Sequence, residues 1–267
     1  ISLHGMEEAL GITYNKKGVK DKIPYVLVRY ADDFLILSKS EQLAEKAKEI
    51  ISSWLSERGL KLSASKTKIR HIEEGVDFLG VNIRRRSTEG KKCGKLLLMT
   101  PSKQAQQSFR DKMRKLWKEV TNKPLHCAIR ELNSRILGWG SYYRYYVSKV
   151  IFTSMDNWMW KRQVRYRYKR HPHKSWKWCY SRYWGKIPGR EGIWTFRDPK
   201  TGQYLYKMSW IPIERQQMVK GRNSPDNPEL RAYWIQRQAY KKVYGGKLRS
   251  KLWYKQRGLC EVCQGEL

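Results

Sequence analysis

Apolar residues in the first hundred positions gather in short runs with the composition of strands. Residues 25–29 and 34–38 are aliphatic, aromatic or β-branched at most positions, which predicts two strands joined by a tight turn at residues 30–33. The stretches LKLSASKTKIRHI (60–72) and DFLGVNIRRR (77–86) predict further short strands joined by polar turns. This part of the chain therefore favours a mostly antiparallel sheet.

Helical spacing accounts for many of the other apolar positions. One helix is predicted between Ser40, which stands where an N-cap belongs, and Gly59, which ends it. From residue 101 onward, three more stripes separated by short loops predict a three-helix bundle. The predicted fold class is therefore α+β, an antiparallel sheet with packed helices followed by a helical bundle. The four stripes are Leu43, Ala47, Ile50, Ile51, Trp54 and Leu55; Phe109, Met113, Leu116, Trp117 and Val120; Leu125, Ile129, Leu132, Ile136 and Trp139; and Ile151, Met155, Trp158 and Met159.

The charge of the chain is strongly positive and unevenly distributed. The sequence holds 56 Lys and Arg against 24 Asp and Glu, a net charge of +32. Residues 1–100 hold 19 basic and 13 acidic residues, so 37 and 11 fall in residues 101–267, where we expect a polyanion to bind. No run approaches the ~18 uninterrupted apolar residues of a membrane helix, and no secretory signal opens the chain. Nucleic acid is therefore favoured over a membrane as the partner.

The region between Trp139 and Trp184 is the most specific part of this basic half. It contains 15 aromatic residues, 11 Lys or Arg and a single acid, Asp156. Aromatic rings interleaved with arginines can stack on unpaired bases while the cations contact phosphates. The alternative is that the aromatic residues form a core and the cations a solvated face. The candidate nucleic-acid ligands are Arg144, Arg162, Arg165, Arg167, Arg170, Lys174 and Trp176.

The stretch VRYADDFLIL (28–37) places Asp32 and Asp33 side by side at the predicted turn. Aspartate is common in solvated turns, which is one interpretation of the pair. Because the flanking strands are apolar on both faces, we instead expect a buried turn, where two adjacent carboxylates require a cation. Mg²⁺ suits this position, since it keeps one or two protein carboxylates while nucleotide phosphates complete its coordination shell. Two such ions about 4 Å apart would support nucleotidyl transfer.

Taken together, these motifs resemble the group II intron-encoded reverse transcriptase/maturase family. YADD between two strands, GLKLSASKTKI and FLGVNIR follow the order of the last palm motifs of reverse transcriptases, and ISLHGMEE resembles the end of the preceding motif. RHPHKSWKWCYSRYW is similar to the thumb, or maturase, region, and RGLCEVCQGEL to the start of an HNH endonuclease domain. The resemblance implies a C-terminal palm at residues 1–100, a three-helix thumb at 101–173, a basic DNA-binding region at 174–252 and the start of the endonuclease domain at 253–267.

The resemblance also assigns roles to the residues of the turn. Asp32 and Asp33 match the metal-binding carboxylates of the palm, which implies Mg²⁺ as cofactor. Tyr30 and Ala31 match positions that line the nucleotide and the primer terminus.

Two further palm motifs receive roles in the same way. Lys66, in SASKTK, matches a lysine near the leaving pyrophosphate, with a solvated loop lysine as the alternative. Leu79 and Gly80 match the primer grip, where a missing side chain lets a backbone approach closely. An ordinary strand glycine is the alternative there.

The function implied is an RNA-directed DNA polymerase that binds intron RNA and target DNA, uses dNTPs, and supports intron splicing and mobility. Family members carry another metal-binding aspartate in an N-terminal fingers and palm half. Since nothing before Ile1 supplies it, we expect this chain alone to be inactive and the N-terminal half to be a partner. The alternative is an RNA-binding splicing maturase without polymerase activity. A nicking endonuclease would depend on residues after Leu267.

The cysteines suggest a reducing compartment. Their number, five, is odd, and the pattern does not resemble a secreted disulfide framework, so a bacterial cytoplasm or an organelle is expected. Cys260 and Cys263 form a CxxC, which is half of a four-ligand Zn²⁺ site. The resemblance implies that the complete endonuclease domain would supply the other ligands.

Overall fold

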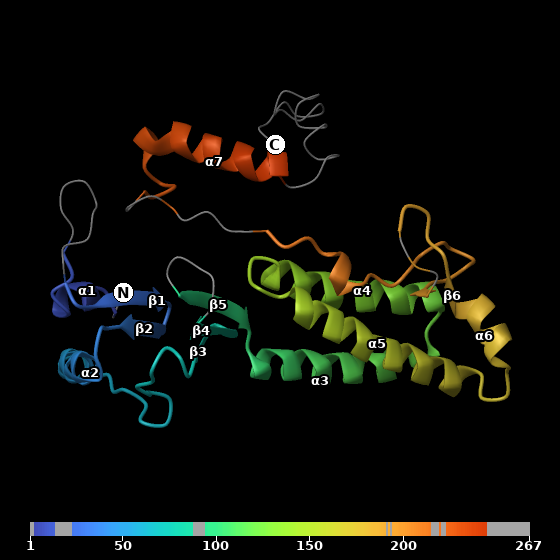
Figure 1. Cartoon of the computed structure of the whole chain (residues 1–267), viewed down its shortest axis with the longest axis horizontal. Helices are drawn as coiled ribbons and strands as arrows, with labels where there is room; N and C mark the ends of the chain where they lie inside the picture. The colour runs from blue at the N-terminus through green and yellow to red at the C-terminus, as the bar shows by residue number, and fades with distance from the viewer. Residues whose placement is uncertain are drawn as a thin grey trace. The chain divides into compact units, whose positions relative to one another are not determined.

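A computed structural model (Figure 1) describes residues 3–13, 23–87, 94–190, 192, 194–214, 219 and 223–244. The chain divides into two compact units, residues 1–10 with 24–216 and residues 11–23 with 217–267. The described part of the first unit combines antiparallel strand pairs with helices, so the predicted α+β class is confirmed.

The first strands of the chain form a hairpin accompanied by two helices. Strands β1 (Val26–Tyr30) and β2 (Asp33–Leu37) pair antiparallel, with Tyr30 opposite Asp33. Helix α2 (Glu41–Ser56) begins where predicted, because the Ser40 side chain accepts a hydrogen bond from the Leu43 amide. The short helix α1 (Met6–Ala9) contacts α2, and α2 contacts β2. The buried side chains of these elements are Met6, Leu10, Tyr25, Ala47, Ile51 and Leu55.

A second, three-stranded sheet follows, with strand order β3-β4-β5. Strands β3 (Val76–Phe78) and β4 (Val81–Ser87) are joined by the two-residue turn Leu79–Gly80, and β5 (Lys95–Pro101) pairs with the other edge of β4. Both turn residues have positive φ, 50° at Leu79 and 76° at Gly80. This sign pattern is that of a type I′ hairpin turn, whose twist matches that of the strands it joins.

The strand predicted in residues 60–72 is not present. This stretch folds into turns, in which the amides of Lys66 and Thr67 both donate to the carbonyl of Ser63. Serine-rich segments favour such local hydrogen bonds over sheet pairing. Ile72 still accepts a hydrogen bond from the Arg85 amide of β4, and the additional strand of this sheet is β5, which the pattern analysis missed.

Three long helices form the predicted bundle: α3 (Lys103–Glu119), α4 (Leu125–Tyr143) and α5 (Lys149–Arg170). Ser102 caps α3 by accepting a hydrogen bond from the Ala105 amide, and the 3-10 turn η1 (Val120–Asn122) leads into α4. The predicted stripes form one hydrophobic core, in which Leu116, Trp139, Ile151 and Trp158 are partly buried and the other members are buried. Helical periodicity thus predicted the core of this part well.

The same core continues past residue 173, where the sequence suggested a separate region. Helix α6 (Trp176–Tyr183), strands β6 (Trp184–Gly185) and β7 (Thr195–Phe196), and the 3-10 turn η2 (Met208–Trp210) all contribute to it. Asn133 of α4 connects this segment to the bundle, because its amide nitrogen donates to the carbonyl of Tyr204 and its oxygen accepts from the amide of Tyr206.

The second unit is described mainly by its last helix. The 3-10 turn η3 (Pro228–Leu230) leads into α7 (Arg231–Tyr244), and the Asn227 side chain accepts a hydrogen bond from the Glu229 amide. Trp234 donates from its indole nitrogen to the carbonyl of Ser224 over 2.9 Å, which fixes the start of this helix to the preceding loop. No helix in the described ranges is long and apolar enough to cross a membrane.

Candidate functional site

The predicted carboxylate pair lies on the turn between β1 and β2. Asp32 is in the two-residue turn, and Asp33 is the first residue of β2. Both are exposed, and Tyr30 beside them is 66 % exposed, so the prediction of a buried turn is wrong. The reason is that β1 pairs with β2 alone among the described residues, which leaves Val26 and Val28 of β1 exposed as well.

The two carboxylates are available to a cation. Neither Asp32 nor Asp33 forms an ion pair or a side-chain hydrogen bond with the part of the chain that is described. Unpaired, exposed carboxylates at one turn fit the one or two protein ligands that Mg²⁺ usually keeps. No cluster of three or more Asp, Glu, His or Cys side chains suited to a metal occurs within the described ranges.

Two other predicted palm residues, Ala31 and Lys66, also lie in turns of the described chain. Ala31, the first residue of the turn, has a φ of 53°, a left-handed conformation that costs roughly 1–2 kcal/mol for a residue with a side chain. Such strain is often found at functional turns. Lys66 is exposed in the turn that follows Ser63, which is compatible both with a role near a phosphate and with a solvated loop lysine.

The predicted primer-grip residues are in contact with the helical bundle. The hydroxyl of Tyr142 donates to the carbonyl of Leu79 over 3.0 Å, and that of Tyr143 donates to the carbonyl of Gly80 over 3.1 Å. A Cβ atom at Gly80 would lie 2.7 Å from the Tyr143 hydroxyl oxygen. The close approach that requires glycine is therefore made by Tyr143.

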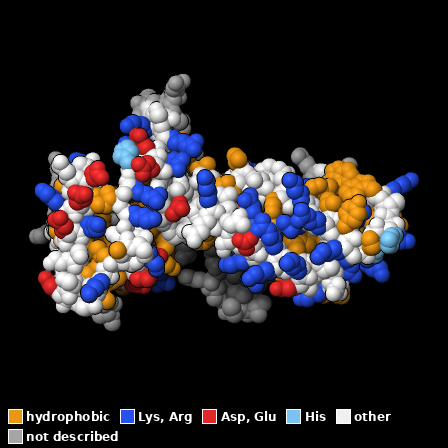
Figure 2. All heavy atoms as spheres, turned by 90° about the horizontal axis from the view of Figure 1, so that it is seen from below, with side chains coloured by type: hydrophobic (Ala, Val, Ile, Leu, Met, Phe, Trp, Pro, Cys, Tyr) orange, Lys and Arg blue, Asp and Glu red, His pale blue; other side chains and the backbone are white. Residues whose placement is uncertain are grey.

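A basic face runs along helices α3 and α5, where Figure 2 shows Lys and Arg side chains gathered over the bundle. The guanidinium carbons of Arg114 and Arg162 lie 5.6 and 4.9 Å from the centroid of the Trp158 ring. Burial, followed by the positive charges of Arg165 and Arg114, lowers the pKa of Arg162 below its ordinary value. Arg165 is exposed and has no acidic partner in the described chain. We define Arg114, Trp158, Arg162 and Arg165 as the α3/α5 face, where cations repel one another and an anion would be stabilised.

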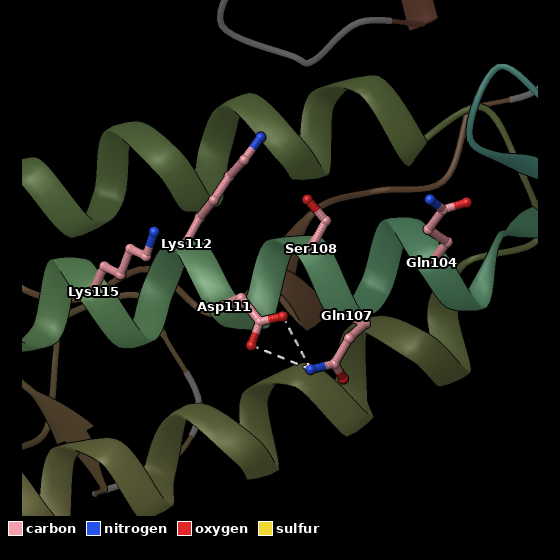
Figure 3. A pocket seen from close by; sticks show the side chains of 6 residues that line it. All are labelled: Gln104, Gln107, Ser108, Asp111, Lys112 and Lys115. Atoms are coloured by element: carbon pink, nitrogen blue, oxygen red, sulfur yellow. Dashed lines mark hydrogen bonds between the residues drawn. The ribbon is translucent and has the colours of Figure 1, made fainter.

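Further polar side chains follow α3 along a shallow hollow (Figure 3). In it, Gln107 donates two hydrogen bonds to the carboxylate of Asp111, at 3.1 and 3.2 Å, and Arg114 forms an ion pair with the same group. The negative charge of Asp111 is therefore compensated by Arg114 and Gln107 of the same helix. The hollow is lined by Gln104, Gln107, Ser108, Asp111, Lys112 and Lys115.

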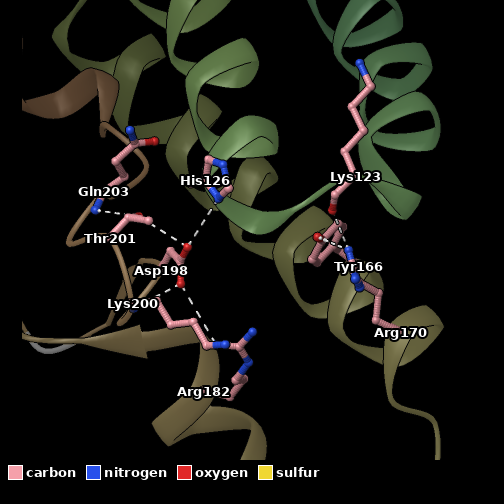
Figure 4. Close-up of polar contacts among 9 residues, drawn as sticks. All are labelled: Lys123, His126, Tyr166, Arg170, Arg182, Asp198, Lys200, Thr201 and Gln203. Carbon is pink, nitrogen blue, oxygen red and sulfur yellow. Dashed lines mark hydrogen bonds and ion pairs between the residues drawn. The ribbon is translucent and has the colours of Figure 1, made fainter.

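Two of the predicted nucleic-acid ligands are instead occupied by contacts within the protein. Arg144 forms an ion pair with Glu214, 70 residues later. Arg170 donates to the carbonyls of Thr121 and Lys123 at 2.9 and 2.7 Å, and to the Tyr166 hydroxyl at 3.0 Å (Figure 4). Both arginines therefore contribute contacts to the fold, so we expect them to contact phosphate less than an arginine without such partners.

Asp198 is a buried acid that the sequence analysis did not single out. Only 4 % exposed, it accepts hydrogen bonds from the Lys200 amide and the Thr201 hydroxyl, and lies within 4.0 Å of His126 and Arg182 (Figure 4). An aspartate followed by a turn with Thr and Gly is a local signal for this arrangement. Its contacts fix the loop after β7, so we interpret it as structural.

The remaining predicted ligands lie at the end of the bundle. Arg167 is only 6 % exposed, so it is not the free surface cation that the sequence suggested. Its guanidinium carbon lies 4.0 Å from the Tyr168 ring centroid and 4.9 Å from that of Trp176. Trp176 is 41 % exposed, and the ammonium of Lys174 lies 5.5 Å from the Trp178 ring.

Sequence reasoning did not include Arg114 and Trp158 among the candidate ligands. A signal for them existed, since Arg110, Arg114 and Lys118 recur every four residues on the polar face of α3, and Trp158 and Arg162 are four apart on α5. What brings these stripes together is the packing of α3 and α5, which is a tertiary feature.

Antiparallel strands with an exposed carboxylate pair, followed by a bundle with a basic face, are compatible with a protein that handles nucleic acid. Comparison with known protein families identifies the class of protein more closely. Residues 6–83 match the reverse transcriptase (RNA-dependent DNA polymerase) family, and residues 106–184 match the group II intron, maturase-specific domain. The chain belongs to the group II intron reverse transcriptase/maturase proteins. No curated protein sequence matches it.

The predicted endonuclease segment was not part of either match. Residues 253–267, with Cys260 and Cys263, lie outside the described residues, so the predicted Zn²⁺ ligands stay a prediction.

Proposed function

We propose that the chain is the C-terminal palm, thumb and DNA-binding part of an RNA-directed DNA polymerase that acts in intron splicing and mobility. Its partners would be intron RNA, target DNA and dNTPs. The observation that carries this proposal is the exposed, unpaired pair Asp32 and Asp33 on a two-residue hairpin turn, within the region that matches reverse transcriptases.

Asp32 and Asp33 would hold Mg²⁺, since the resemblance assigns them this role and their carboxylates are free to bind it. When bound, Mg²⁺ would activate the primer 3′-oxygen and stabilise the leaving pyrophosphate. Tyr30, 66 % exposed and opposite Asp33 in the hairpin register, would contact the nucleotide or the primer terminus, as the resemblance implies. Lys66 would contribute a positive charge near the pyrophosphate.

The α3/α5 face would hold the RNA. Arg162 and Arg165 have no acidic partner in the described chain and lie close to a third arginine, Arg114. RNA phosphates would supply the negative charge that Arg162 and Arg165 lack. Cation–π contacts with the Trp158 ring would keep the side chains of Arg114 and Arg162 in place. The polar side chains along α3 would add hydrogen bonds to the RNA backbone.

Primer extension on an RNA template with Mg²⁺ and dNTPs tests the proposal. The chain would be assayed alone and mixed with a separately expressed fragment that supplies the fingers and the earlier palm strands. The decisive variant is Asp32→Asn with Asp33→Asn, and Glu45→Gln, an exposed acid on α2, is the matched control. RNA binding and thermal unfolding are measured on the same samples.

We expect extension by the mixture and by the Glu45→Gln control, and none by the double variant, with RNA binding and the unfolding midpoint unchanged. Both aspartates are exposed without partners, so their replacement costs little stability. Extension by the double variant would refute the assignment of the pair. A mixture that binds RNA tightly but never extends a primer would instead support a splicing maturase without polymerase activity.

A further inference from the structure

A cluster of tryptophan and tyrosine rings lies where α6 joins the bundle, and Figure 2 shows an exposed hydrophobic patch at this end of the bundle. Trp176 and Trp194 are 41 % and 40 % exposed, although tryptophan is usually largely buried. Their ring centroids are 6.2 Å apart and the ring planes differ by 32°. Two large rings thus lie close to one another and are both partly exposed to solvent.

The exposed rings stand on a rigid aromatic layer. Trp184, 1 % exposed, has its ring centroid 5.4 Å from that of Trp176, and its indole nitrogen donates to the side-chain oxygen of the buried Gln163 over 3.1 Å. Tyr180 lies edge-on to Trp194 at 4.5 Å. Because Trp176 packs on the buried, hydrogen-bonded Trp184 and Trp194 packs on Tyr180, both rings are preorganised, which lowers the entropy lost when a ligand binds.

Arg167 supplies a positive charge directly beside these rings. It is the one Lys or Arg that is buried within the described ranges, and it has no ion pair or hydrogen bond there. Its Nε atom is fully buried without a partner, and the group contacts the rings of Tyr168 and Trp176. A buried guanidinium that contacts aromatic rings but no acid within the described residues is one that an anion would stabilise.

The ligand that combines an anion with a flat ring is a nucleotide. Residues 174–190 contain five Lys or Arg and no acid, which favours a polyanion over an apolar or basic protein surface. The base must be unpaired, because the π faces of paired bases are covered by their neighbours in a duplex. A single-stranded segment therefore fits this cluster of rings better than duplex RNA does.

We propose that Trp176, Trp194 and Arg167 form a binding site for an unpaired nucleotide, in which the base stacks on the exposed tryptophan rings and its phosphate pairs with Arg167. We call this the stacking site. It rests on the RNA binding of the proposed function and deepens it, and it shares no residue with the α3/α5 face.

The test measures the affinity of the full chain for two fluorescent probes, an oligouridylate of about 12 nucleotides and an RNA duplex of the same length. One variant combines Trp176→Leu with Trp194→Leu, and a second is Arg167→Met. Trp178→Leu is the matched control, because Trp178 is also exposed and on the same helix but packs against His171. Thermal unfolding is recorded for every variant.

We expect the double variant to bind the oligouridylate about tenfold to hundredfold more weakly, in keeping with the stacking contribution of one base, while its affinity for the duplex is unchanged. Arg167→Met should weaken single-strand binding about tenfold, because it removes the cation beside the exposed rings. It also removes the cation–π contacts with Tyr168 and Trp176, so we expect a small fall in the unfolding midpoint. The Trp178→Leu control should bind both probes normally.

Several results would contradict the proposal of a stacking site. Wild-type affinity of the double variant for the oligouridylate would refute it, as would an equal loss for both probes. Competition by polyglutamate as strong as that by the oligouridylate would show that only charge is recognised, as for an acidic protein. If the wild type binds the duplex but not the single strand, the stacking site fails while the RNA binding of the proposed function stands. Binding of neither probe would refute both.

Discussion

The hydroxyl of Tyr143 donates a hydrogen bond of 3.1 Å to the carbonyl of Gly80, 63 residues earlier in the chain. Tyr142 makes the equivalent bond to Leu79, and the Ser102 amide donates to the same Gly80 carbonyl over 2.9 Å. The tight turn between β3 and β4 is therefore fixed to the start of α3 and to the end of α4. Since both turn residues have positive φ, the contact holds a conformation that few residues adopt readily.

Replacing Gly80 by alanine should destabilise the protein by about 2–5 kcal/mol, measured by urea unfolding. The left-handed backbone accounts for roughly 1–2 kcal/mol of this, and overpacking adds roughly 1–3 kcal/mol, because the new Cβ would lie 2.7 Å from the Tyr143 hydroxyl. Gly189→Ala is the matched control, since Gly189 has a φ of 73° with nothing within 4 Å of the added Cβ. That control should show the backbone cost alone.

The Tyr143→Phe background separates the two contributions. Without the hydroxyl, the Gly80→Ala penalty should fall to that of Gly189→Ala, because the atom that the Cβ meets is gone. An equal penalty for Gly80→Ala in both backgrounds would show that Tyr143 does not constrain this turn.

The Tyr143 hydroxyl should also lose its proton at an unusually high pH. Burial, followed by the neighbouring Tyr142 and Tyr146, raises its pKa from 10.0 to about 12. Because the folded state holds this proton more tightly than the unfolded state, the stabilising contribution is complete below pH 10 and is lost as the pH rises toward 12. The absorbance titration of the wild type minus that of Tyr143→Phe should show one phenol near 12, which returns to its ordinary range in urea. A difference curve centred near 10 in the folded protein would contradict this.

A single asparagine should account for much of the attachment of residues 204–206 to the bundle. Asn133→Ala leaves the Tyr206 amide and the Tyr204 carbonyl without their partner, which should lower the unfolding free energy by about 1–3 kcal/mol. Asn157→Ala, at an exposed position of α5, is the control and should change it by less than about 0.5 kcal/mol. Equal effects of the two substitutions in urea unfolding would refute the role of Asn133.

The bundle was predictable from the sequence because its signal is local. Phe109, Met113 and Trp117 recur at helical spacing, and they are buried as that spacing requires. The segment at residues 60–72 was not predictable in the same way, because hydrogen bonds within its serine-rich turn compete with sheet pairing. The exposure of the Asp32–Asp33 turn was also missed, since an apolar strand pair does not reveal what covers its faces.

For the site, composition predicted a basic surface but not which arginines form it. Arg144 and Arg170 looked equivalent to Arg165 in the sequence, yet one pairs with Glu214 and the other with carbonyls of the η1 region. Those partners lie at least 47 residues away along the chain, so only the tertiary fold distinguishes a structural cation from a free one.

The salt dependence of RNA binding should separate these two kinds of arginine. Arg165→Gln and Arg162→Gln should each reduce the slope of log affinity against log salt by about 1, because each is expected to neutralise one phosphate. Arg170→Gln should leave the slope unchanged and instead lower the unfolding free energy by roughly 1–3 kcal/mol, since it leaves the carbonyls of Thr121 and Lys123 without their donor. The measurement is fluorescence anisotropy with duplex RNA over a series of salt concentrations, beside urea unfolding of each variant. A slope that falls with Arg170→Gln but not with Arg165→Gln would reverse the assignment, and a slope near zero for the wild type would contradict phosphate binding by the α3/α5 face.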